Sequence, residues 1–545
     1  MIALRSASGY PWTWVAVGIA SVLAVPIAAV LSSLARPRGE VWLHLWRTQL
    51  VELVLNTVLL LAGVGAGTLL VGTGLAWLIV HYRFPGRALF EWALILPLAV
   101  PAYVIGFAFL GLFDYAGPVQ GTLRSWLGQG NRLPEMRSSW GVILVMTLVF
   151  YPYVYLLARV AFREQGVAGI ETARTLGRSR LGAFLHVTLP LARPSLAAGV
   201  ALAMMEALAD FGTVATFGFR TLTEAVYRVW NGMFDRVAAT QLASVLLLFA
   251  LALILLERRS RGRARFAESR RRGPMPPPPR LRGFRAALAA AACLIVLGLA
   301  FALPVGQLAW WGAGALRAGQ VAPDFIALLG RTCTLATATA LLACVLAVLL
   351  AYAGRLHATP PVRLAARFAS MGYALPGAVI AVGVLLPLSW VDHAIVPELE
   401  RWLQRPLGLL LTGSAAGLVL AYLVRFLAVS LQSVEAGLSK ISPSLDDAAR
   451  SLGVRSGGAL RRVHVPLLRG SLLTAVVLVF VETMKEMPAT LLLRPLGFNT
   501  LAVEIWERTS EAMWQEASVP ALTLVAIGLL PVVALVRLTA RRSGF

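Results

Sequence analysis

Long apolar segments dominate this sequence and limit the folds that are open to it. Of its 545 residues, 58% are hydrophobic and only 14% are charged. A helix that crosses a bilayer needs about 20 mostly apolar residues, and about twelve segments meet that requirement. The sequence therefore predicts an all-α integral membrane protein with about twelve transmembrane helices. The segments are 12–34, 52–80, 88–112, 140–160, 196–217, 240–256, 286–310, 332–353, 370–390, 407–429, 471–491 and 519–538.

Two loops of the sequence share one unusual pattern. In each, an acidic residue and an alanine two positions later are followed by a glycine and then by a proline with the same spacing. The second loop lies about half of the chain length after the first. Residues in the apolar segments around the two loops correspond at nearly the same distance, so we interpret the chain as a duplication. The residues are Glu171, Ala173, Gly177 and Pro190 in the first loop (161–195), and Asp447, Ala449, Gly453 and Pro466 in the second (430–470).

The duplication predicts two homologous halves, residues 1–256 and 286–545, each with six transmembrane helices. An even number of helices per half gives a parallel repeat about an axis along the membrane normal. Residues 257–285 between them are basic and Pro-rich, which is typical of a linker. A site for nucleic acid or anionic lipid is the alternative for this segment, but a solvated cytoplasmic linker that binds no nucleic acid is favoured.

The distribution of charge predicts the topology. The net charge is +23, and the loops on the same side as the two patterned loops carry the excess of Lys and Arg. The positive-inside rule then places both loops and both termini in the cytoplasm. The surrounding lipid is an expected partner. The three cysteines lie in apolar segments and show neither a disulfide framework nor metal-binding spacing, which is typical of core residues. No cofactor is expected.

The repeated pattern resembles the cytoplasmic EAA loop in the membrane subunits of ATP-binding cassette importers. The resemblance implies that a short helix after the acidic residue docks onto an ATPase subunit, and two copies imply two fused membrane subunits. Gly177 and Gly453 permit a sharp turn after that helix. The alternative is that Glu171 and Asp447 only cap helices, and Ser444 is spaced to form a capping box with Asp447.

The sequence contains no phosphate-binding loop of the form G-x-x-x-x-G-K-[ST]. Its only lysines are Lys440 and Lys485, and neither follows a glycine. We therefore expect no enzymatic activity in this chain, and ATP hydrolysis on two separate cytoplasmic ATP-binding subunits.

Four carboxylates fall within predicted membrane helices. Glu206 and Asp210 are spaced to share one helix face, and Glu482 and Glu486 repeat that spacing. A charge at bilayer depth is unfavourable by about 2.5–3.5 kcal/mol, so such groups normally face the protein interior or water. We predict that the four line a translocation pathway and contact a hard cation such as Fe³⁺ transiently. The alternative is that Glu482 or Glu486 pairs with Lys485 and locks helices together.

Further segments resemble the fused permeases of periplasmic ferric-iron importers. They are 96–103, 113–120, 206–212, 485–490 and 493–501. The resemblance implies an inner-membrane permease that receives Fe³⁺ from a periplasmic binding protein, with Tyr103 as a further ligand or as a packing residue. The outward segments 114–138, 218–238, 391–406 and 492–518 are the expected docking surface. Thiamine, a phosphonate or another small solute stays open as the cargo, and an ion-coupled secondary transporter is the rival class.

Overall fold

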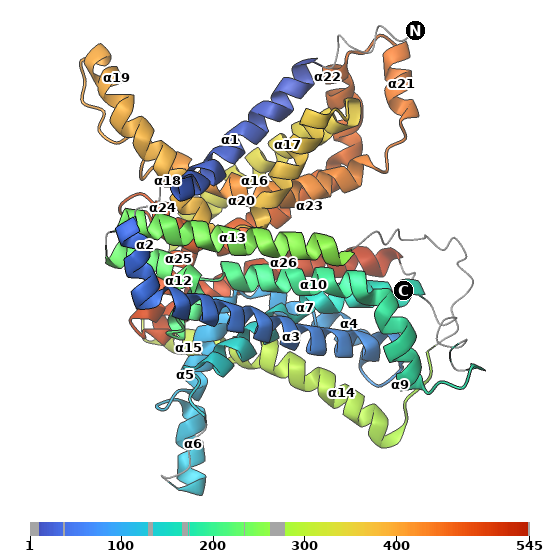
Figure 1. Ribbon diagram of the computed structural model, residues 1–545. Coiled ribbons are helices and arrows are strands. Elements are labelled where there is room, and N and C mark those ends of the chain that lie inside the picture. The colour runs from blue at the N-terminus through green and yellow to red at the C-terminus, as the bar shows by residue number, and fades with distance from the viewer. Residues whose placement is uncertain are drawn as a thin grey trace. The chain divides into compact units, whose positions relative to one another are not determined.

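The computed structural model describes residues 10–35, 39–128, 134–165, 173, 175–233, 235–261 and 278–542 (Figure 1). Within these ranges twelve helices are long and apolar enough to cross a membrane, which confirms the number predicted from the sequence. The predicted linker lies partly outside the described residues, because 262–277 is not among them.

The chain forms two compact units, and each unit takes residues from both halves of the sequence. Unit 1 comprises Met1–Leu45, Val226–Leu247 and Ala322–Trp506. Unit 2 comprises Trp46–Ala225, Leu248–Val321 and Glu507–Phe545. Each unit therefore contains the central helices of one half together with terminal segments of the other half. The boundaries 1–256 and 286–545 describe a sequence repeat and stay a prediction.

Unit 1 is centred on three long helices, α16 (Phe325–Leu356), α20 (Ala415–Leu438) and α23 (Val465–Lys485), which pack against one another. The first helix of the chain, α1 (Tyr10–Ala35), packs on α17 (Pro360–Met371) and on α18 (Gly377–Ala394). In Figure 1 the blue α1 runs beside the yellow α17. The first helix thus completes the apolar surface of helices that belong to the second half of the sequence.

Unit 2 repeats this arrangement around α3 (Val51–His81), α7 (Ser139–Gln165) and α10 (Leu189–Ala209). Glycines bring these helices close together: a Cβ atom on Gly72 would lie 2.9 Å from the backbone oxygen of Tyr151, and one on Gly199 would lie 2.8 Å from the Cα of Val154. Small residues at such contacts are the usual means by which membrane helices pack tightly. Around this core, α15 (Leu303–Arg317) packs on α5 (Ala102–Phe113) and α26 (Trp514–Arg542).

The remaining helices connect or flank these elements. They are α2 (Gly39–Leu45), α4 (Arg87–Ala93), α6 (Pro118–Leu127), α9 (Arg180–Ala183), α11 (Gly212–Thr216), α12 (Leu222–Tyr227), α13 (Arg236–Arg261), α14 (Gly283–Leu297), α19 (Val396–Leu403), α21 (Ser444–Ser451), α22 (Ser456–Ala459), α24 (Pro488–Leu493) and α25 (Leu501–Ser510). Short π-helical turns, η4 (Phe184–Thr188) and η8 (Leu460–His464), precede α10 and α23.

Four of the predicted continuous segments are broken in the structure. One of them, 370–390, is interrupted between the end of α17 at Met371 and the start of α18 at Gly377. Another, 88–112, is divided between α4 and α5, with Pro97 in a short 3-10 turn (Leu96–Ala99) and Pro101 directly before α5. Proline has no N–H to donate and disfavours a helical conformation in the residue before it, so a helix does not run through this stretch. The segments 196–217 and 471–491 are broken at Asp210 and Glu486, where the predicted site residues lie.

Candidate functional site

The first pair of membrane carboxylates does not share a helix face. Helix α10 ends at Ala209, and Asp210 has extended backbone angles (φ −75°, ψ 109°). Its carboxylate accepts a hydrogen bond from the backbone N–H of Thr213 at 2.7 Å and another from the Thr213 hydroxyl at 3.0 Å. Asp210 therefore caps the following short helix, and the expectation that it lies on one helix face with Glu206 is wrong.

The second pair repeats this geometry. Helix α23 ends at Lys485, and Glu486 is extended (φ −70°, ψ 114°) and accepts a hydrogen bond from the N–H of Ala489 at 3.0 Å. The side chain of Glu486 also forms an ion pair with Arg425 of α20. The two residues are only 4% and 9% exposed. The partner of Glu486 is thus Arg425, a residue that the sequence interpretation did not single out.

The arginine of this buried ion pair is not repeated in the first half of the sequence. In the register that aligns the two EAA-like loops, Arg425 corresponds to Val149 and Glu486 to Asp210. A Cβ atom on Gly377 would overlap the Glu486 carboxylate, so the absence of a side chain there makes room for the pair. The two halves therefore hold their second carboxylate in the same backbone conformation, and a valine in the first half takes the place of the arginine that pairs with Glu486.

The remaining candidates lie within helices. Glu206 on α10 and Glu482 on α23 are half-buried, and Tyr103 on α5 is 6% exposed. Among the residues that the structure describes, no group of three or more His, Cys, Asp or Glu side chains is arranged to hold a metal ion. A role in translocation for these three residues, and for Asp210 and Glu486, stays a prediction.

The two EAA-like loops form the same turn. Gly177 and Gly453 have positive φ angles of 83° and 75°, in the left-handed region that favours glycine. The N–H of Arg178 bonds to the carbonyl of Ala173 at 3.0 Å, and the N–H of Val454 bonds to that of Ala449 at the same distance. These bonds close the end of a short helix in the same way in both loops. The sharp turn that was expected at both glycines is confirmed.

The other predicted loop residues lie as follows. Pro190 and Pro466 are each the second residue of a long helix, α10 and α23, where proline is well tolerated. Asp447 is exposed on α21 and pairs with Arg450 of the same helix. Helix α21 starts after Pro443 without a side-chain cap, so the capping box predicted for Ser444 does not form. Glu171 lies outside the described residues.

A partly buried polar cluster around His464 holds the second loop against the membrane helices. One carboxylate oxygen of Asp446 on α21 lies 2.6 Å from His464 Nε2, and the other accepts a hydrogen bond from Arg355 Nε of α16 at 2.9 Å. Burial alone would raise the pKa of the Asp446 carboxyl, but the hydrogen bonds from Arg355 and His464 lower it below its usual value. Asp446 therefore stays charged at neutral pH, and its contribution to loop stability is lost only as the pH falls into the acid range.

The sequence interpretation missed this cluster because it weighed only the residues of the pattern. The first half has Val80 where the second has Arg355, and Thr188 where the second has His464. The offsets between these positions are 275 and 276 residues, as they are for the rest of the repeat. The signal was present in two places: an additional acid directly before Asp447, and a histidine where the first loop has threonine.

Replacing Asp446 with alanine is expected to loosen α21, because Arg355 and His464 then lose a shared acceptor in a mostly buried site. We expect the free energy of local opening of residues 444–451, measured by amide hydrogen exchange, to fall by about 1–3 kcal/mol. Asp447→Ala is the matched control: its ion pair is exposed, so a change within about 0.5 kcal/mol is expected. Equal effects of the two substitutions would contradict the assigned role of Asp446.

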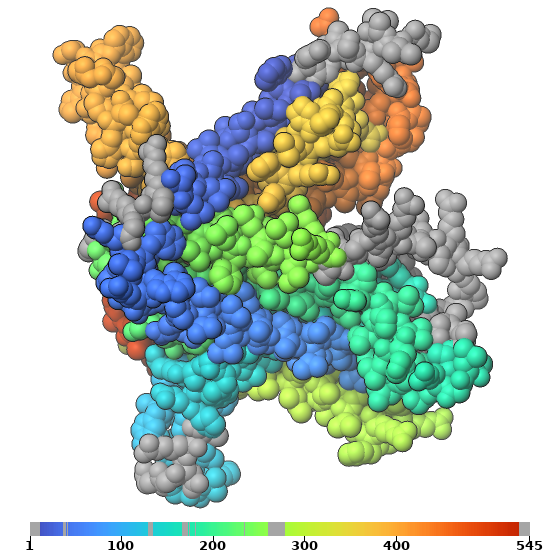
Figure 2. All heavy atoms as spheres, viewed as in Figure 1, coloured from blue at the N-terminus to red at the C-terminus, as the bar shows by residue number. Residues whose placement is uncertain are grey.

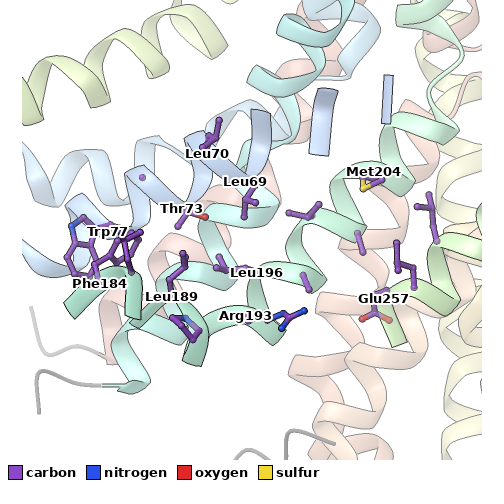
Figure 3. Close-up of a pocket in the computed structure, with 18 residues that line it drawn as sticks. Leu69, Leu70, Thr73, Trp77, Phe184, Leu189, Arg193, Leu196, Met204 and Glu257 are labelled. Atoms are coloured by element: carbon purple, nitrogen blue, oxygen red, sulfur yellow. The ribbon is translucent and has the colours of Figure 1, made fainter. Parts of the chain in front are cut away.

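A pocket of about 910 Å³ adjoins the first loop within unit 2 (Figure 3). It lies between α3, the η4–α10 segment and α13, and its lining is mainly apolar, with Trp77 and Phe184 side by side at one end. Pro190 is part of this lining, and none of the four membrane carboxylates is. The pocket therefore belongs to the junction between the loop and the membrane helices and does not contain the predicted pathway residues.

Comparison with known proteins adds a family to this geometry. Residues 68–263 and 343–544 each match the model described as "Binding-protein-dependent transport system inner membrane component". The chain is 26% identical over 492 residues to the Fe(3+)-transport system permease protein FbpB 2 of Haemophilus influenzae, a match that covers 90% of each protein.

Two further relatives match a smaller part of the chain. The sulfate transport system permease protein CysT of Escherichia coli is 31% identical over 43% of this chain and 84% of its own length. The molybdenum transport system permease protein ModB of Escherichia coli is 31% identical over 33% of this chain and 78% of its own length. The ferric permease thus matches nearly the whole of this chain, whereas the sulfate and molybdenum permeases match less than half of it.

Proposed function

The chain belongs to the family of binding-protein-dependent transport system inner membrane components, and we propose that it forms the membrane pathway of an importer for Fe³⁺. As a multi-pass permease of an ATP-binding cassette importer, it is not itself an enzyme. Membership of this family implies an ATPase and a periplasmic binding protein as partners. In the proposal, the binding protein delivers Fe³⁺, and both termini and both EAA-like loops lie in the cytoplasm.

The length of the similarity to the ferric permease is the observation that carries the choice of cargo. That match covers 90% of both proteins, whereas the matches to the sulfate and molybdenum permeases cover about one half of this chain or less. The presence of carboxylates at membrane depth also favours a cation over an oxyanion, because hard cations bind oxygen ligands. Sulfate or molybdate is the competing cargo, and thiamine or a phosphonate stays an alternative.

Uptake by whole cells tests the cargo. Iron-starved cells with and without this gene are supplied with radiolabelled Fe³⁺, sulfate, molybdate or thiamine in parallel. We expect only iron uptake to fall in the deletion strain and to return with the intact gene. Loss of sulfate or molybdate uptake with normal iron uptake would leave the importer architecture in place and overturn Fe³⁺ as the cargo.

A substitution at Gly177 tests whether the first EAA-like loop attaches the permease to the ATPase. Gly177→Asp is expected to release the ATPase, because a bulkier charged residue then stands in the turn that presents the docking helix. A Cβ atom on Gly177 meets nothing within 4 Å, so the substitution should not disturb the packing of the permease itself. We expect ATPase recovery in co-purification to fall at least about tenfold, which corresponds to about 1.4 kcal/mol of binding free energy.

The matched control for this experiment is Gly218→Asp. Gly218 also has a positive φ (67°) and also has open space at the Cβ position, so the backbone strain of the two substitutions is similar. Unchanged ATPase recovery with Gly177→Asp, or the same loss with Gly218→Asp, would count against a specific role of the loop.

A further inference from the structure

The apolar pocket beside the first EAA-like loop has the depth of one leaflet of a bilayer. It lies between α3, the η4–α10 segment and α13, and all of its lining residues belong to unit 2. Along α10 the lining runs from Arg193 to Met204, which is about 16 Å at 1.5 Å per residue. One leaflet contributes about 15 Å of hydrocarbon, half of the membrane core. The pocket therefore has a length that suits a lipid chain.

Three leucines that line the pocket are exposed. Leu70 of α3, Leu185 of η4 and Leu256 of α13 are 75%, 46% and 61% exposed, and each lies within a candidate membrane span. In Figure 2 the blue spheres of α3 and the blue-green spheres of the η4–α10 segment adjoin on the visible face. A leucine that is exposed at membrane depth contacts lipid tails, so the pocket is open to the bilayer.

One charge of each sign lines the end of the pocket that is nearest the EAA-like loops. Arg193 is the fifth residue of α10, which begins on that side of the membrane, and Glu257 is the fifth residue from the end of α13, which ends there. Each lies about 6 Å inside the end of its helix. Arg258 and Arg259, which follow Glu257, are exposed and are not part of the lining.

Thr73 of α3 brings an unsatisfied hydroxyl to the same pocket. Thr57 and Thr68 of this helix each donate a hydrogen bond to the carbonyl four residues earlier, at 2.7 Å. The Thr73 hydroxyl has no hydrogen-bond partner among the residues that the structure describes, although Thr73 is only 7% exposed. Figure 3 shows Thr73 facing Leu196 of α10 across the pocket. Since a buried hydroxyl without a partner is unfavourable, a ligand with an acceptor at this depth would stabilise the site.

Thr73 and Arg193 lie at nearly the same depth in the membrane. Successive spans alternate in direction, so α3 ends and α10 begins on the side of the EAA-like loops. A Cβ atom on Gly65 of α3 would lie 3.2 Å from the Sδ of Met204 and 3.5 Å from Val200, so these residues share one level. Thr73 follows Gly65 by eight residues, and Arg193 precedes Val200 by seven. The hydroxyl and the guanidinium are therefore level with each other along the membrane normal.

We propose that this pocket binds one phospholipid with an ethanolamine headgroup, from the leaflet on the side of the EAA-like loops. An acyl chain fills the apolar part, and an ester carbonyl accepts the hydrogen bond of Thr73. The phosphate accepts hydrogen bonds from Arg193, and the ammonium group donates to the Glu257 carboxylate. A headgroup with one charge of each sign thus matches the two charges of the lining.

The site goes beyond the proposed function, because it does not depend on the cargo. Pro190 of the first EAA-like loop and Phe184 of the η4 turn are part of the same lining. A lipid bound there contacts α3 and the start of α10 together. It therefore stabilises the junction through which the first loop is attached to the membrane helices.

Lipid titration of the purified chain, followed by native mass spectrometry, tests the proposal. The delipidated chain in detergent is titrated with dioleoyl-phosphatidylethanolamine and, in parallel, with dioleoyl-phosphatidylglycerol. We expect the ethanolamine lipid to fill one saturable site. The glycerol lipid, which lacks the ammonium group and carries a net negative charge, is expected to bind there at least about tenfold more weakly.

Two substitutions show whether the lipid occupies this pocket. Arg193→Gln removes the charge that binds the phosphate. Gly74→Leu places a side chain inside the pocket, because Gly74 is part of the lining and a Cβ atom on it meets nothing within 4 Å. Each substitution is expected to weaken binding of the ethanolamine lipid by about tenfold or more.

Each substitution has a matched control. Arg469→Gln is made at the fifth residue of α23, the position that Arg193 has in α10, and the second half has Val348 in place of Thr73. Gly306→Leu is made at another exposed glycine of a unit 2 membrane span that also has open space at the Cβ position. A change below about twofold is expected for both controls.

The absence of a saturable site for the ethanolamine lipid in the wild-type chain would overturn the proposal. Equally tight binding of the glycerol lipid, or the same loss of affinity in a variant and in its control, would also overturn it. Because neither cargo nor partner protein is present in the titration, its outcome is independent of the proposed function.

Discussion

Replacing Arg425 with methionine is expected to destabilise unit 1 by about 3–5 kcal/mol, because Glu486 would remain buried without its partner. Glu486 is 4% exposed, and the apolar helices around it offer little solvation for a charge. The free energy of unfolding of the purified chain, followed by helical circular dichroism in a mixed-micelle denaturant series, measures the change.

A double substitution provides the control for this prediction. Arg425→Met combined with Glu486→Gln removes both charges but keeps an oxygen that can accept the hydrogen bond from Ala489. Because a buried pair replaced as a whole is often close to neutral, we expect most of the lost stability to return. Val149 already occupies the corresponding position of the first half, where no arginine is present. A double variant as unstable as Arg425→Met would contradict the importance of the ion pair.

Uptake of Fe³⁺ is expected to fall to background when Glu206 and Glu482 are both replaced by glutamine. These are the two candidate carboxylates that lie within regular helix, one in each unit, and both are half-buried. Glutamine keeps the size of the side chain and removes the negative charge, so the loss isolates the electrostatic contribution to cation passage. If each carboxylate stabilises the ion at the rate-limiting step of its passage by about 3 kcal/mol, the loss of either one would reduce the rate by more than a hundredfold.

The control for this experiment removes two carboxylates elsewhere. Glu40→Gln with Asp324→Asn changes the net charge by the same amount at exposed positions outside the predicted pathway, and normal uptake is expected. Assembly with the ATPase is measured for both double variants. Normal Fe³⁺ uptake by the Glu206 and Glu482 variant would remove these residues from the pathway, whatever its cargo.

The number of membrane helices and the turn of the EAA-like loops could be predicted because each depends on local sequence. Span length follows from a run of apolar residues, and a positive φ at Gly177 and Gly453 follows from the pattern around them. The breaks at Asp210 and Glu486 were missed because apolar residues continue on both sides. The available signals were the glycine two residues after Asp210 and the proline two residues after Glu486, which favour the end of a helix.

Contacts between distant parts of the chain could not be predicted from the sequence. Hydropathy identifies α1 as a membrane helix but does not say that it packs on α17 and α18. Arg425 appeared as a single charge in an apolar segment, although an intramembrane arginine is itself a reason to search for a partner. The cluster of Arg355, Asp446 and His464 likewise joins three segments that only the fold brings together.

Reconstitution tests the importer assignment most directly. The chain is placed in proteoliposomes with its ATPase and the iron-loaded binding protein, and accumulation of radiolabelled Fe³⁺ is followed with and without ATP. We expect accumulation only when ATP and both partners are present, and none from the chain alone under a proton or sodium gradient. Gradient-driven accumulation by the chain alone would contradict the importer and establish a secondary transporter.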